Sequence, residues 1–230
     1  MLKHNLGKNI EIEIGEKVYE RLTIRTRLVT PKDKIADIVK EFALPEMKKG
    51  DILVISEKVV AITQGRSYSM DEIKPTKLAK FLAGYVTKTP YGIGISIPET
   101  MELALREVGD FRMIFAAIVA ALTKPLGIKG IFYRIAGTGA RAIDGPTPYT
   151  IPPYNTHATL GPKDPNGTAE KIAKSLGCPI IIIDANDLGV NILGMSEKVD
   201  KKLIEHIFKD NPMGQTDEQT PLCILRTKKI

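Results

Sequence analysis

An aspartate that follows a long apolar run is the clearest candidate for chemistry in this sequence. The run Pro179–Ile183 leads directly to Asp184, and Asp187 comes three residues later. In α/β proteins, ligands bind at the carboxyl ends of strands, and carboxylate oxygens are suitable ligands for a hard divalent cation. The same two aspartates could instead do no more than cap a turn. The pattern alone leaves both interpretations open.

The segment Asp210–Pro221 is a second candidate, because it combines a glycine with several side-chain oxygens. Gly214 is followed by Gln215, Asp217 and Glu218, just before a predicted strand. Backbone amides of a glycine-containing loop can line a phosphate group, and the side-chain oxygens can reach a metal ion. The alternative is an ordinary polar surface loop.

Lys58 and Asp144 carry two further signals for an anion or a metal. Lys58 comes just after the apolar run Ile52–Ser56, where an ammonium group can meet a phosphate as a point charge. Asp144 lies near Arg141 in a stretch rich in proline and glycine, and the pair could bind an anion. An exposed lysine and a common Asp-Gly turn are the plainer explanations of these patterns.

The segment Arg141–Tyr154 is predicted to recognise an acceptor substrate rather than a nucleotide. Its four prolines restrict the backbone, so the segment loses little entropy when a ligand binds. Tyr149 and Tyr154 offer flat apolar faces suited to a ring-bearing molecule, and Arg141 can bind a carboxylate or a phosphate. The alternative is that the segment covers an interface between two lobes, with its tyrosines packed inward.

Several common kinds of site are absent from the sequence. It contains neither a GxxxxGK[ST] phosphate loop nor a GxGxxG dinucleotide motif, and its three histidines lack metal-ligand spacing. The two cysteines, Cys178 and Cys223, lie in apolar runs and are expected to be buried, reduced thiols. These features fit a protein of a reducing cytoplasm.

The composition is that of a globular protein without a membrane span. The chain has 230 residues, of which 43% are hydrophobic and 26% charged, and no apolar run approaches the roughly 18 residues of a transmembrane helix. The formal net charge is +6, but the lysines are dispersed along the chain. We therefore expect an anionic small ligand or a solvated lysine face rather than a nucleic acid or a membrane as partner.

The elements that must position these residues mix strands and helices without strict alternation. The patterns therefore predict a mixed α/β (α+β) chain in two lobes, treated as one domain over 1–230. Strands are predicted over 21–29, with Leu22, Ile24, Thr26 and Leu28 inward, and over 52–56, 127–137, 179–184 and 221–227. Helices are predicted after Thr30, after Thr76, over 99–109, over 111–124 as a buried helix, over 165–176 and over 196–210.

Five segments in order together resemble the gamma-glutamyl ligase family of coenzyme F420 biosynthesis, and more closely a divergent, poorly characterised branch of it. They are GDILVISEKVVAITQGR, GIFYRIAGTGARAIDG, LGPKDPNGTAEKIAKSL, CPIIIIDANDLG and MGQTDEQTPLCILR. The resemblance implies a two-lobed gamma-glutamyl-ligase-like fold, an intertwined homodimer and a requirement for GTP or ATP with Mg2+ or Mn2+. It implies metal-binding positions at Asp144, Asp184 and Gln215, with Asp187 as a substitute ligand. It also implies that Lys58 and the loop Met213–Thr220 (Met213, Gly214, Asp217, Glu218 and Thr220) lie at the nucleotide.

The sequence departs from the family pattern at four positions in or next to these five segments. Ala185 replaces the threonine that follows the strand aspartate, Ile62 replaces a second lysine, Gln64 replaces a glutamate and Thr147 replaces an asparagine.

The resemblance implies a ligase that adds L-glutamate, or another amino acid, to a small carboxylate through an acyl phosphate. A folate or pterin gamma-glutamyl ligase and a non-catalytic nucleotide- or metal-binding relative remain as alternatives.

Overall fold

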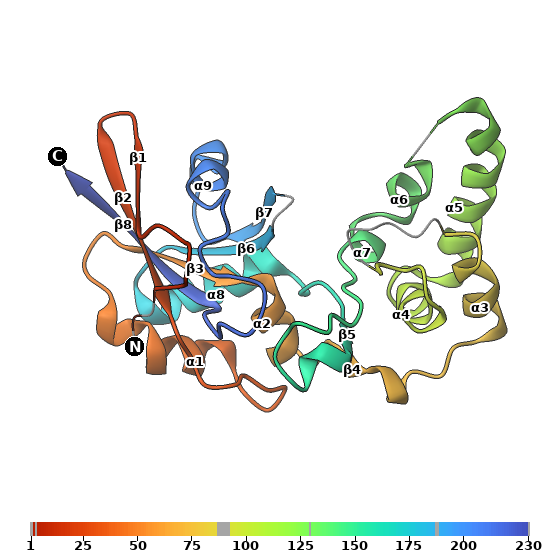
Figure 1. The fold of residues 1–230 in the computed structure, drawn as a ribbon, viewed down its shortest axis with the longest axis horizontal. Helices are drawn as coiled ribbons and strands as arrows, with labels where there is room; N and C mark the ends of the chain where they lie inside the picture. Colours follow the sequence, from red (N-terminus) through yellow and green to blue (C-terminus); the bar gives the residue numbers. More distant parts are fainter. Residues whose placement is uncertain (1, 3, 87–92, 129, 187–188, 230) are drawn as a thin grey trace. The chain divides into compact units, whose positions relative to one another are not determined.

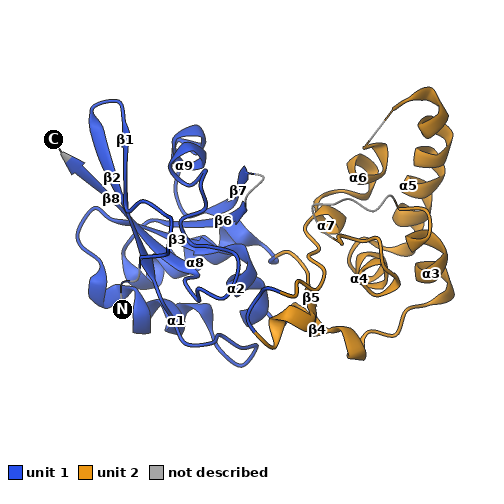
Figure 2. Cartoon of the chain, in the orientation of Figure 1, with its two compact units in different colours: residues 1–65, 149–151, 162–230 blue, residues 66–148, 152–161 orange. Residues whose placement is uncertain are grey.

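The chain divides into two compact units, which Figure 2 shows in different colours. The computed structural model describes residues 2, 4–86, 93–128, 130–186 and 189–229. Unit 1 comprises residues 1–65, 149–151 and 162–230, and unit 2 comprises residues 66–148 and 152–161. Both helices and strands are present, which confirms the mixed α/β class. None of the described helices is long and apolar enough to span a bilayer.

Unit 1 is built on a six-stranded mixed sheet with the strand order β1-β2-β8-β3-β6-β7 (Figure 1). β3 and β6 pair in parallel, whereas the other neighbouring strands pair antiparallel. The strands are β1 Glu11–Ile14, β2 Lys17–Ile24, β3 Ile52–Ser56, β6 Ile180–Asn186, β7 Gly189–Met195 and β8 Leu222–Lys229.

Helices cover both faces of this sheet. Ile181 and Ile183 pack with Ile204 and Ile207 of α9 on one face, and the alternate residues Ile180 and Ile182 are also buried. The first four residues of β6, Ile180–Ile183, are all apolar and buried, as expected for a strand segment covered on both sides. The helices of unit 1 are α1 Ile35–Phe42, α2 Glu57–Thr63, α8 Pro165–Leu176 and α9 Lys201–Ile207, with a 3-10 turn η1 at Leu44–Glu46.

Side-chain caps fix two of the predicted helix starts in unit 1. Asp164 accepts a hydrogen bond from the Gly167 amide, so α8 begins at Pro165 as predicted. Asp200 accepts from the Leu203 amide in the same way, so α9 begins only at Lys201. Thr30 does not cap α1, because its amide and hydroxyl both donate to Asp33 and the helix starts at Ile35.

Unit 2 is mainly helical and has its own core. Met101, Leu103, Met113 and Ala116 lie at the centre of this core. Its helices are α3 Lys77–Ala83, α4 Pro98–Val108, α5 Asp110–Thr123, α6 Ile131–Ala136 and α7 Thr138–Arg141, with 3-10 turns η2 Met70–Glu72, η3 Lys124–Leu126 and η4 Tyr154–Thr156. Its two strands, β4 Ser67–Ser69 and β5 His157–Thr159, form a separate antiparallel pair.

Two predictions for unit 2 are wrong. Residues 131–136 form helix α6 rather than a strand, because Gly130 and Gly137 take positive φ at its two ends and the short apolar run packs against α5. Such a run has no periodicity that separates a strand from a helix. α5 exists but is not a buried helix: only Met113 and Ala116 are buried, whereas Phe111 is 92% exposed.

The inward face predicted for residues 21–29 is confirmed only in part: Ile24 and Thr26 are buried, whereas Leu22 and Leu28 are half-buried. Tyr19, Arg21 and Thr23 of β2 are buried instead. Arg21 can lie inside because its guanidinium pairs with Asp210 and donates to the Ile207 carbonyl at 2.8 Å. Hydrophobicity alone cannot reveal that a partner neutralises a buried arginine.

Candidate functional site

Three strand ends bring most of the candidate residues of unit 1 to one edge of the sheet. Ser56, the last residue of β3, is paired with Ile183, which directly precedes Asp184. The Ser56 amide donates to the carbonyl of Pro221 at 2.9 Å, just before β8 begins. Because neighbouring strands lie about 4.8 Å apart, Asp184, the start of α2 and the loop before β8 are neighbours at this edge. Figure 1 shows β8, β3 and β6 side by side.

The loop Met213–Thr220 is held from beneath by buried side chains. The Thr220 hydroxyl donates to the Met213 carbonyl at 2.6 Å and closes the loop. The Asn5 side chain donates to the Thr220 hydroxyl at 2.7 Å and to the Pro212 carbonyl at 2.9 Å. Asn211 donates to the Gly214 carbonyl at 3.2 Å. The base of the loop is therefore a fixed hydrogen-bonded structure.

The backbone of this loop is unusual at both ends. Asn211 and Gln219 have φ values of 46° and 57°, a left-handed conformation that is uncommon for residues other than glycine. In addition, Asn5 Oδ1 and Asn211 Oδ1 are buried and accept no hydrogen bond from the described part of the chain. Strained backbone and buried, unsatisfied polar atoms concentrate at functional sites.

Inside the loop, the carboxylate of Glu218 turns back onto the backbone. Its Oε2 atom accepts a hydrogen bond from the Thr216 amide at 2.7 Å. It also lies against Gly214, where an added Cβ would come within 2.4 Å of the carboxyl carbon. Asp217, by contrast, is exposed, and Gln215 is half-buried.

Asp184 lies inside a strand pair rather than in the turn. β6 does not end at Asp184 as predicted but continues to Asn186, and Asp184 is paired with Asn191 of β7. The side chain of Asn186 donates to Asp184 Oδ1 at 3.3 Å. Asp187 lies outside the described residues.

Lys58 is half-buried in the first turn of α2. Two departures from the family pattern lie on or next to the same helix. Ile62 is buried in the core, so this position supplies no cation. Gln64 binds both backbone groups of Lys163: its Oε1 accepts from the amide at 2.7 Å and its Nε2 donates to the carbonyl at 3.0 Å. A glutamate could make only the first of these bonds.

Asp144 and the residues assigned to the acceptor lie mostly in unit 2. Asp144 is exposed, and its backbone pairs with Thr159 through two hydrogen bonds of 2.9 Å. Arg141 is also exposed, whereas Tyr154 is buried and its ring contacts that of His157 edge-on. Tyr149 belongs to unit 1 and is 61% exposed. The metal role of Asp144 and the acceptor role of the other three residues stay predictions.

The oxygen atoms at the sheet edge are of the kind that a hard cation prefers. Asp184 offers a carboxylate and Gln215 an amide carbonyl, which suit magnesium or manganese better than zinc. Among the described residues there is no group of three or more His, Cys, Asp and Glu side chains that could hold a metal ion. The donor types fit a divalent metal, but Asp184 and Gln215 alone would leave most of its coordination positions to water or to a ligand.

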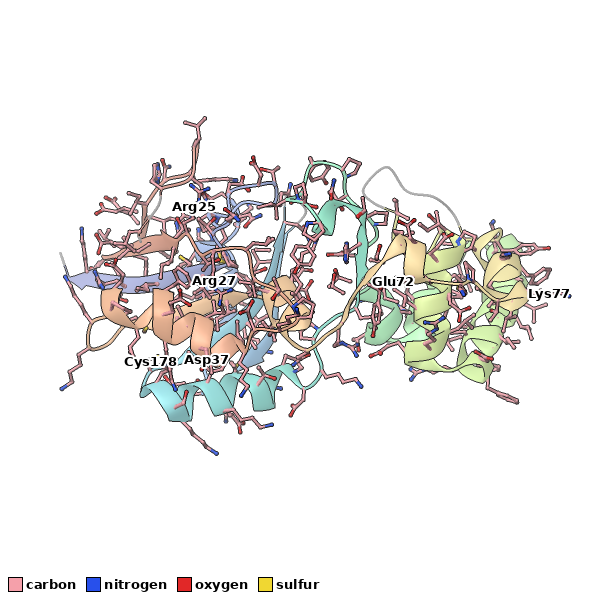
Figure 3. The ribbon with its side chains drawn as sticks, turned by 90° about the horizontal axis from the view of Figure 1, so that it is seen from below. Arg25, Arg27, Asp37, Glu72, Lys77 and Cys178 are labelled. Atoms are coloured by element: carbon pink, nitrogen blue, oxygen red, sulfur yellow. The ribbon has the colours of Figure 1, made fainter. Side chains whose placement is uncertain are left out.

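The sequence patterns missed residues that support the loop from the beginning of the chain. Arg25 follows β2 directly, and its guanidinium donates to Gln219 Oε1 at 3.2 Å. The amide of Thr26 donates to the Gln219 carbonyl at 3.0 Å. Figure 3 labels Arg25 together with Arg27, which is paired instead with Asp33 and Glu41. No local signal in the sequence marks these contacts, because they join residues that are far apart along the chain.

The two cysteines are free thiols, as expected. Cys223 is fully buried, and burial raises its pKa far above the usual range. Cys178, just after α8 (Figure 3), is only half-buried; its pKa is raised first by burial and then by the charge of Asp51. A raised pKa leaves little thiolate at neutral pH, so neither thiol has the character of a nucleophile.

Comparison with known proteins connects this site to a family. The family model described as F420-0:Gamma-glutamyl ligase matches residues 23–188, a range that includes Lys58, Asp144 and Asp184 but ends before the loop Met213–Thr220. The chain is 36% identical over 85 residues to the coenzyme F420:L-glutamate ligase of Methanopyrus kandleri. That match covers 37% of this chain and 32% of the Methanopyrus protein, about a third of its length. The chain is 25% identical over 214 residues to the coenzyme F420:L-glutamate ligase of Methanothermobacter thermautotrophicus, covering 79% of this chain and 76% of that protein.

Proposed function

Because the chain belongs to the F420-0:gamma-glutamyl ligase family, we propose that it is a ligase that joins L-glutamate, or another amino acid, to the carboxylate of a small molecule. The reaction consumes GTP or ATP and depends on Mg2+ or Mn2+. The two relatives are named for the ligation of L-glutamate to coenzyme F420.

Amide formation in water is uphill, so the carboxylate must first be activated. A nucleotide transfers its terminal phosphoryl group to the carboxylate oxygen and leaves as the diphosphate. The amine of glutamate then attacks the acyl phosphate, the C–O bond to phosphate breaks, and the amine loses a proton. A site for this chemistry needs cations and backbone amides around the phosphoryl group and room for two further substrates.

The residues of unit 1 have the chemical groups for the first of these tasks. Lys58 and the backbone of Met213–Thr220 bind the phosphates, and Asp184 and Gln215 hold the divalent metal. The metal role of Asp144, which lies in unit 2, rests on the family resemblance alone. The metal would neutralise the charge of the transferring phosphoryl group when bound. The acceptor role of Arg141 and Tyr154, in unit 2, and of Tyr149, in unit 1, stays a prediction from the sequence. Asp187 provides a further carboxylate next to Asp184 in the sequence.

One observation carries this proposal: the ends of β3 and β6 and the beginning of β8 lie at one edge of the sheet. Lys58 follows β3, Asp184 lies near the end of β6, and Gln215 lies in the loop before β8. Polar residues gathered at the carboxyl ends of parallel strands are typical of a ligand site in an α/β protein.

Two other functions remain candidates on specific grounds. A folate or pterin gamma-glutamyl ligase would use the same chemistry with a different ring-bearing acceptor. A non-catalytic relative that only binds nucleotide and metal is favoured by Ile62, because a buried isoleucine takes the place of a family lysine.

The test is turnover that depends on both substrates. The protein is incubated with nucleotide, manganese, L-glutamate and a panel of small carboxylates, and the products are identified by mass spectrometry. We expect nucleotide hydrolysis that requires glutamate and an acceptor, and a product heavier by one glutamyl residue. Tight nucleotide binding without amino-acid-dependent hydrolysis would favour the non-catalytic relative. No binding of manganese and nucleotide by calorimetry would contradict both functions.

The metal assignment has a matched test. Asp184→Asn removes one negative charge from β6 and should abolish metal-dependent nucleotide binding without unfolding the chain. Asp37→Asn makes the same change on the exposed face of α1 (Figure 3) and should leave this binding unchanged. If both variants bind manganese and nucleotide as the parent does, Asp184 is not a ligand.

We also propose that the two units are the two lobes of the gamma-glutamyl-ligase-like fold and that two chains form an intertwined homodimer. The exposed apolar residues of α5, Phe111, Phe115, Ile118 and Leu122, support association, because monomers rarely expose such a contiguous patch. Sedimentation equilibrium should give twice the mass of the 25.3 kDa chain. A mass of one chain at micromolar concentration would contradict the dimer.

A further inference from the structure

The carboxylate of Glu218 lies against the backbone of its own loop, at a position formed by Gly214 and Thr216 that we call the seat. The Thr216 amide donates to Glu218 Oε2 at 2.7 Å. On the other side, the carboxylate lies over the Cα atom of Gly214: an added Cβ would come within 2.6 Å of Oε1 and 2.7 Å of Oε2. The seat therefore exists only because residue 214 has no side chain.

This seat has the properties of an anion-binding site. A backbone N–H points at a negatively charged oxygen, and the positive φ of 76° at Gly214 lets the chain turn around the charge. Carboxylate and phosphate oxygens accept hydrogen bonds in the same way, and both are bound more strongly than neutral acceptors. The carboxylate of Glu218 thus takes the position that an external oxyanion would take.

The hydrogen bonds that close this loop and fix its base are made by side chains other than Glu218. The loop is closed by the hydrogen bond from the Thr220 hydroxyl to the Met213 carbonyl, and Asn5 and Asn211 fix its base from below. Asn5, Thr220 and Asn211 are each at most 3% exposed, so water does not compete for these bonds. We therefore expect the closed loop to keep the Thr216 amide in place when the carboxylate leaves.

Glu218 and Asp217 differ although they are neighbours in the same loop. Asp217 is exposed and accepts a 3.4 Å hydrogen bond from the Thr216 hydroxyl, whereas Glu218 is half-buried and accepts from the Thr216 amide. Both residues carry the same negative charge. An effect that depends on occupying the seat is therefore expected only from substitutions of Glu218. An effect of charge alone is expected from substitutions of either residue.

We propose that Gly214 and Thr216 form a seat for one phosphate group of a polyphosphate ligand, and that Glu218 closes this seat until the phosphate displaces it. The proposal rests on the proposed function for the identity of the ligand, a nucleoside triphosphate. Glu218 then acts against phosphate binding, in contrast to a role as a direct nucleotide contact. The competition keeps the seat filled by a carboxylate in the absence of nucleotide, and nucleotide binding releases that carboxylate toward the edge of the sheet.

Substitutions at Glu218 separate occupancy from charge. Glu218→Gln removes the charge but keeps an oxygen that can accept from Thr216, and Glu218→Ala removes both. Binding of inorganic tripolyphosphate is measured by titration calorimetry without divalent metal, acceptor or amino acid. We expect Glu218→Ala to bind about tenfold more tightly than the parent, the ratio for one ordinary hydrogen bond, with Glu218→Gln in between. Equal affinities of the two Glu218 variants would mean that only charge matters and would overturn the proposal.

Asp217→Asn provides the matched control for charge. It should raise tripolyphosphate affinity by less than Glu218→Gln, because it does not vacate the seat. If Glu218→Ala fails to fold, as judged by its circular dichroism, the comparison of Glu218→Gln with Asp217→Asn still shows whether occupancy of the seat or charge alone limits tripolyphosphate binding. Equal gains in these two variants, or a loss of affinity in either Glu218 variant, would contradict the proposal.

A direct readout is the amide resonance of Thr216 in the parent protein. Titration with tripolyphosphate should shift this resonance, and Glu218→Ala should reach the same end point at about one tenth of the ligand concentration. A Thr216 resonance that stays unchanged at saturation would overturn the proposal. Since no ligation is measured, a failure of the proposed ligase activity leaves these outcomes readable, and an active ligase with an unresponsive Thr216 would contradict this inference alone.

Discussion

The side chain of Asn5 donates to the hydroxyl of Thr220, with 2.7 Å between Nδ2 and Oγ1, and so connects the beginning of the chain to the entrance of β8. Both residues are 3% exposed. The hydroxyl in turn donates to the Met213 carbonyl at 2.6 Å, so one chain of hydrogen bonds runs from the N-terminal segment into the loop Met213–Thr220. Asn5 is therefore part of the support of the candidate site although it is distant from the loop in sequence.

Replacing Asn5 by alanine should destabilise unit 1 and loosen this loop. The change leaves the buried Pro212 carbonyl without its donor and Thr220 without one partner, and a buried unsatisfied polar group costs about 1–3 kcal/mol. The free energy of unfolding is measured by urea denaturation. Asn9→Ala is the control, because the Asn9 side chain is exposed and a surface change of this kind stays within about 0.5 kcal/mol. Equal values for the two variants would mean that the Asn5 contact contributes nothing.

Gly214→Ala should be destabilising for two separable reasons. Residue 214 has a φ of 76°, which costs an alanine about 1–2 kcal/mol, and the new Cβ would meet the Glu218 carboxylate. Glu218→Ala removes the second cause but not the first. In a double-mutant cycle, Gly214→Ala should therefore cost less in the Glu218→Ala background than in the parent. Equal costs would show that the carboxylate does not lie over Gly214.

The parts of the fold that the sequence predicts are those encoded by local signals. Asp164 and Pro165 together begin α8, since a capping carboxylate and a proline suit the first turn wherever the helix packs. The run Pro179–Ile183 predicts a buried strand for a similar reason: consecutive β-branched isoleucines favour an extended backbone, and a strand covered on both faces is apolar at successive residues. Neither prediction needs knowledge of a distant partner.

The parts that the sequence does not predict depend on distant partners. β6 runs on beyond Asp184 because β7 pairs with it, and nothing in IDANDLG marks that partner. The buried position of Arg21 likewise depends on Asp210, which is remote in sequence. At the candidate site, the sequence indicates Lys58, Asp184 and the loop Met213–Thr220. It does not indicate Asn5 or Arg25, whose roles follow only from contacts made by the folded chain.

The exposed face of α5 allows a test of whether this helix is buried within the single chain. Leu122 is 69% exposed, whereas Met113 on the same helix is fully buried. Leu122→Gln keeps good helix propensity and should change the free energy of unfolding by no more than about 0.5 kcal/mol. Met113→Gln places an amide in the core of unit 2 and should cost about 2–5 kcal/mol. If the two variants lose equal stability by urea denaturation at submicromolar concentration, Leu122 is buried within the single chain.

Asp33 should make the region before α1 sensitive to acid. The hydrogen bond from Arg27 is the main cause that lowers the pKa of the Asp33 carboxyl far below its usual range, and the Thr30 amide and hydroxyl lower it further against the opposing effect of burial. A carboxyl whose folded pKa is lowered stabilises the protein above its unfolded pKa of about 3.9. This stabilisation is lost as the pH falls from that value through the folded pKa.

Asp33→Asn removes this dependence, so the stability difference between parent and variant should be about 1 kcal/mol at pH 7 and should shrink steadily below about pH 4. Urea denaturation at several pH values between 7 and 2.5 measures it. Asp37→Asn, a change of the same charge on the exposed face of α1, should show no comparable narrowing of its difference from the parent. A difference for Asp33→Asn that stays constant down to pH 2.5 would mean that the contact with Arg27 does not hold the carboxyl ionised.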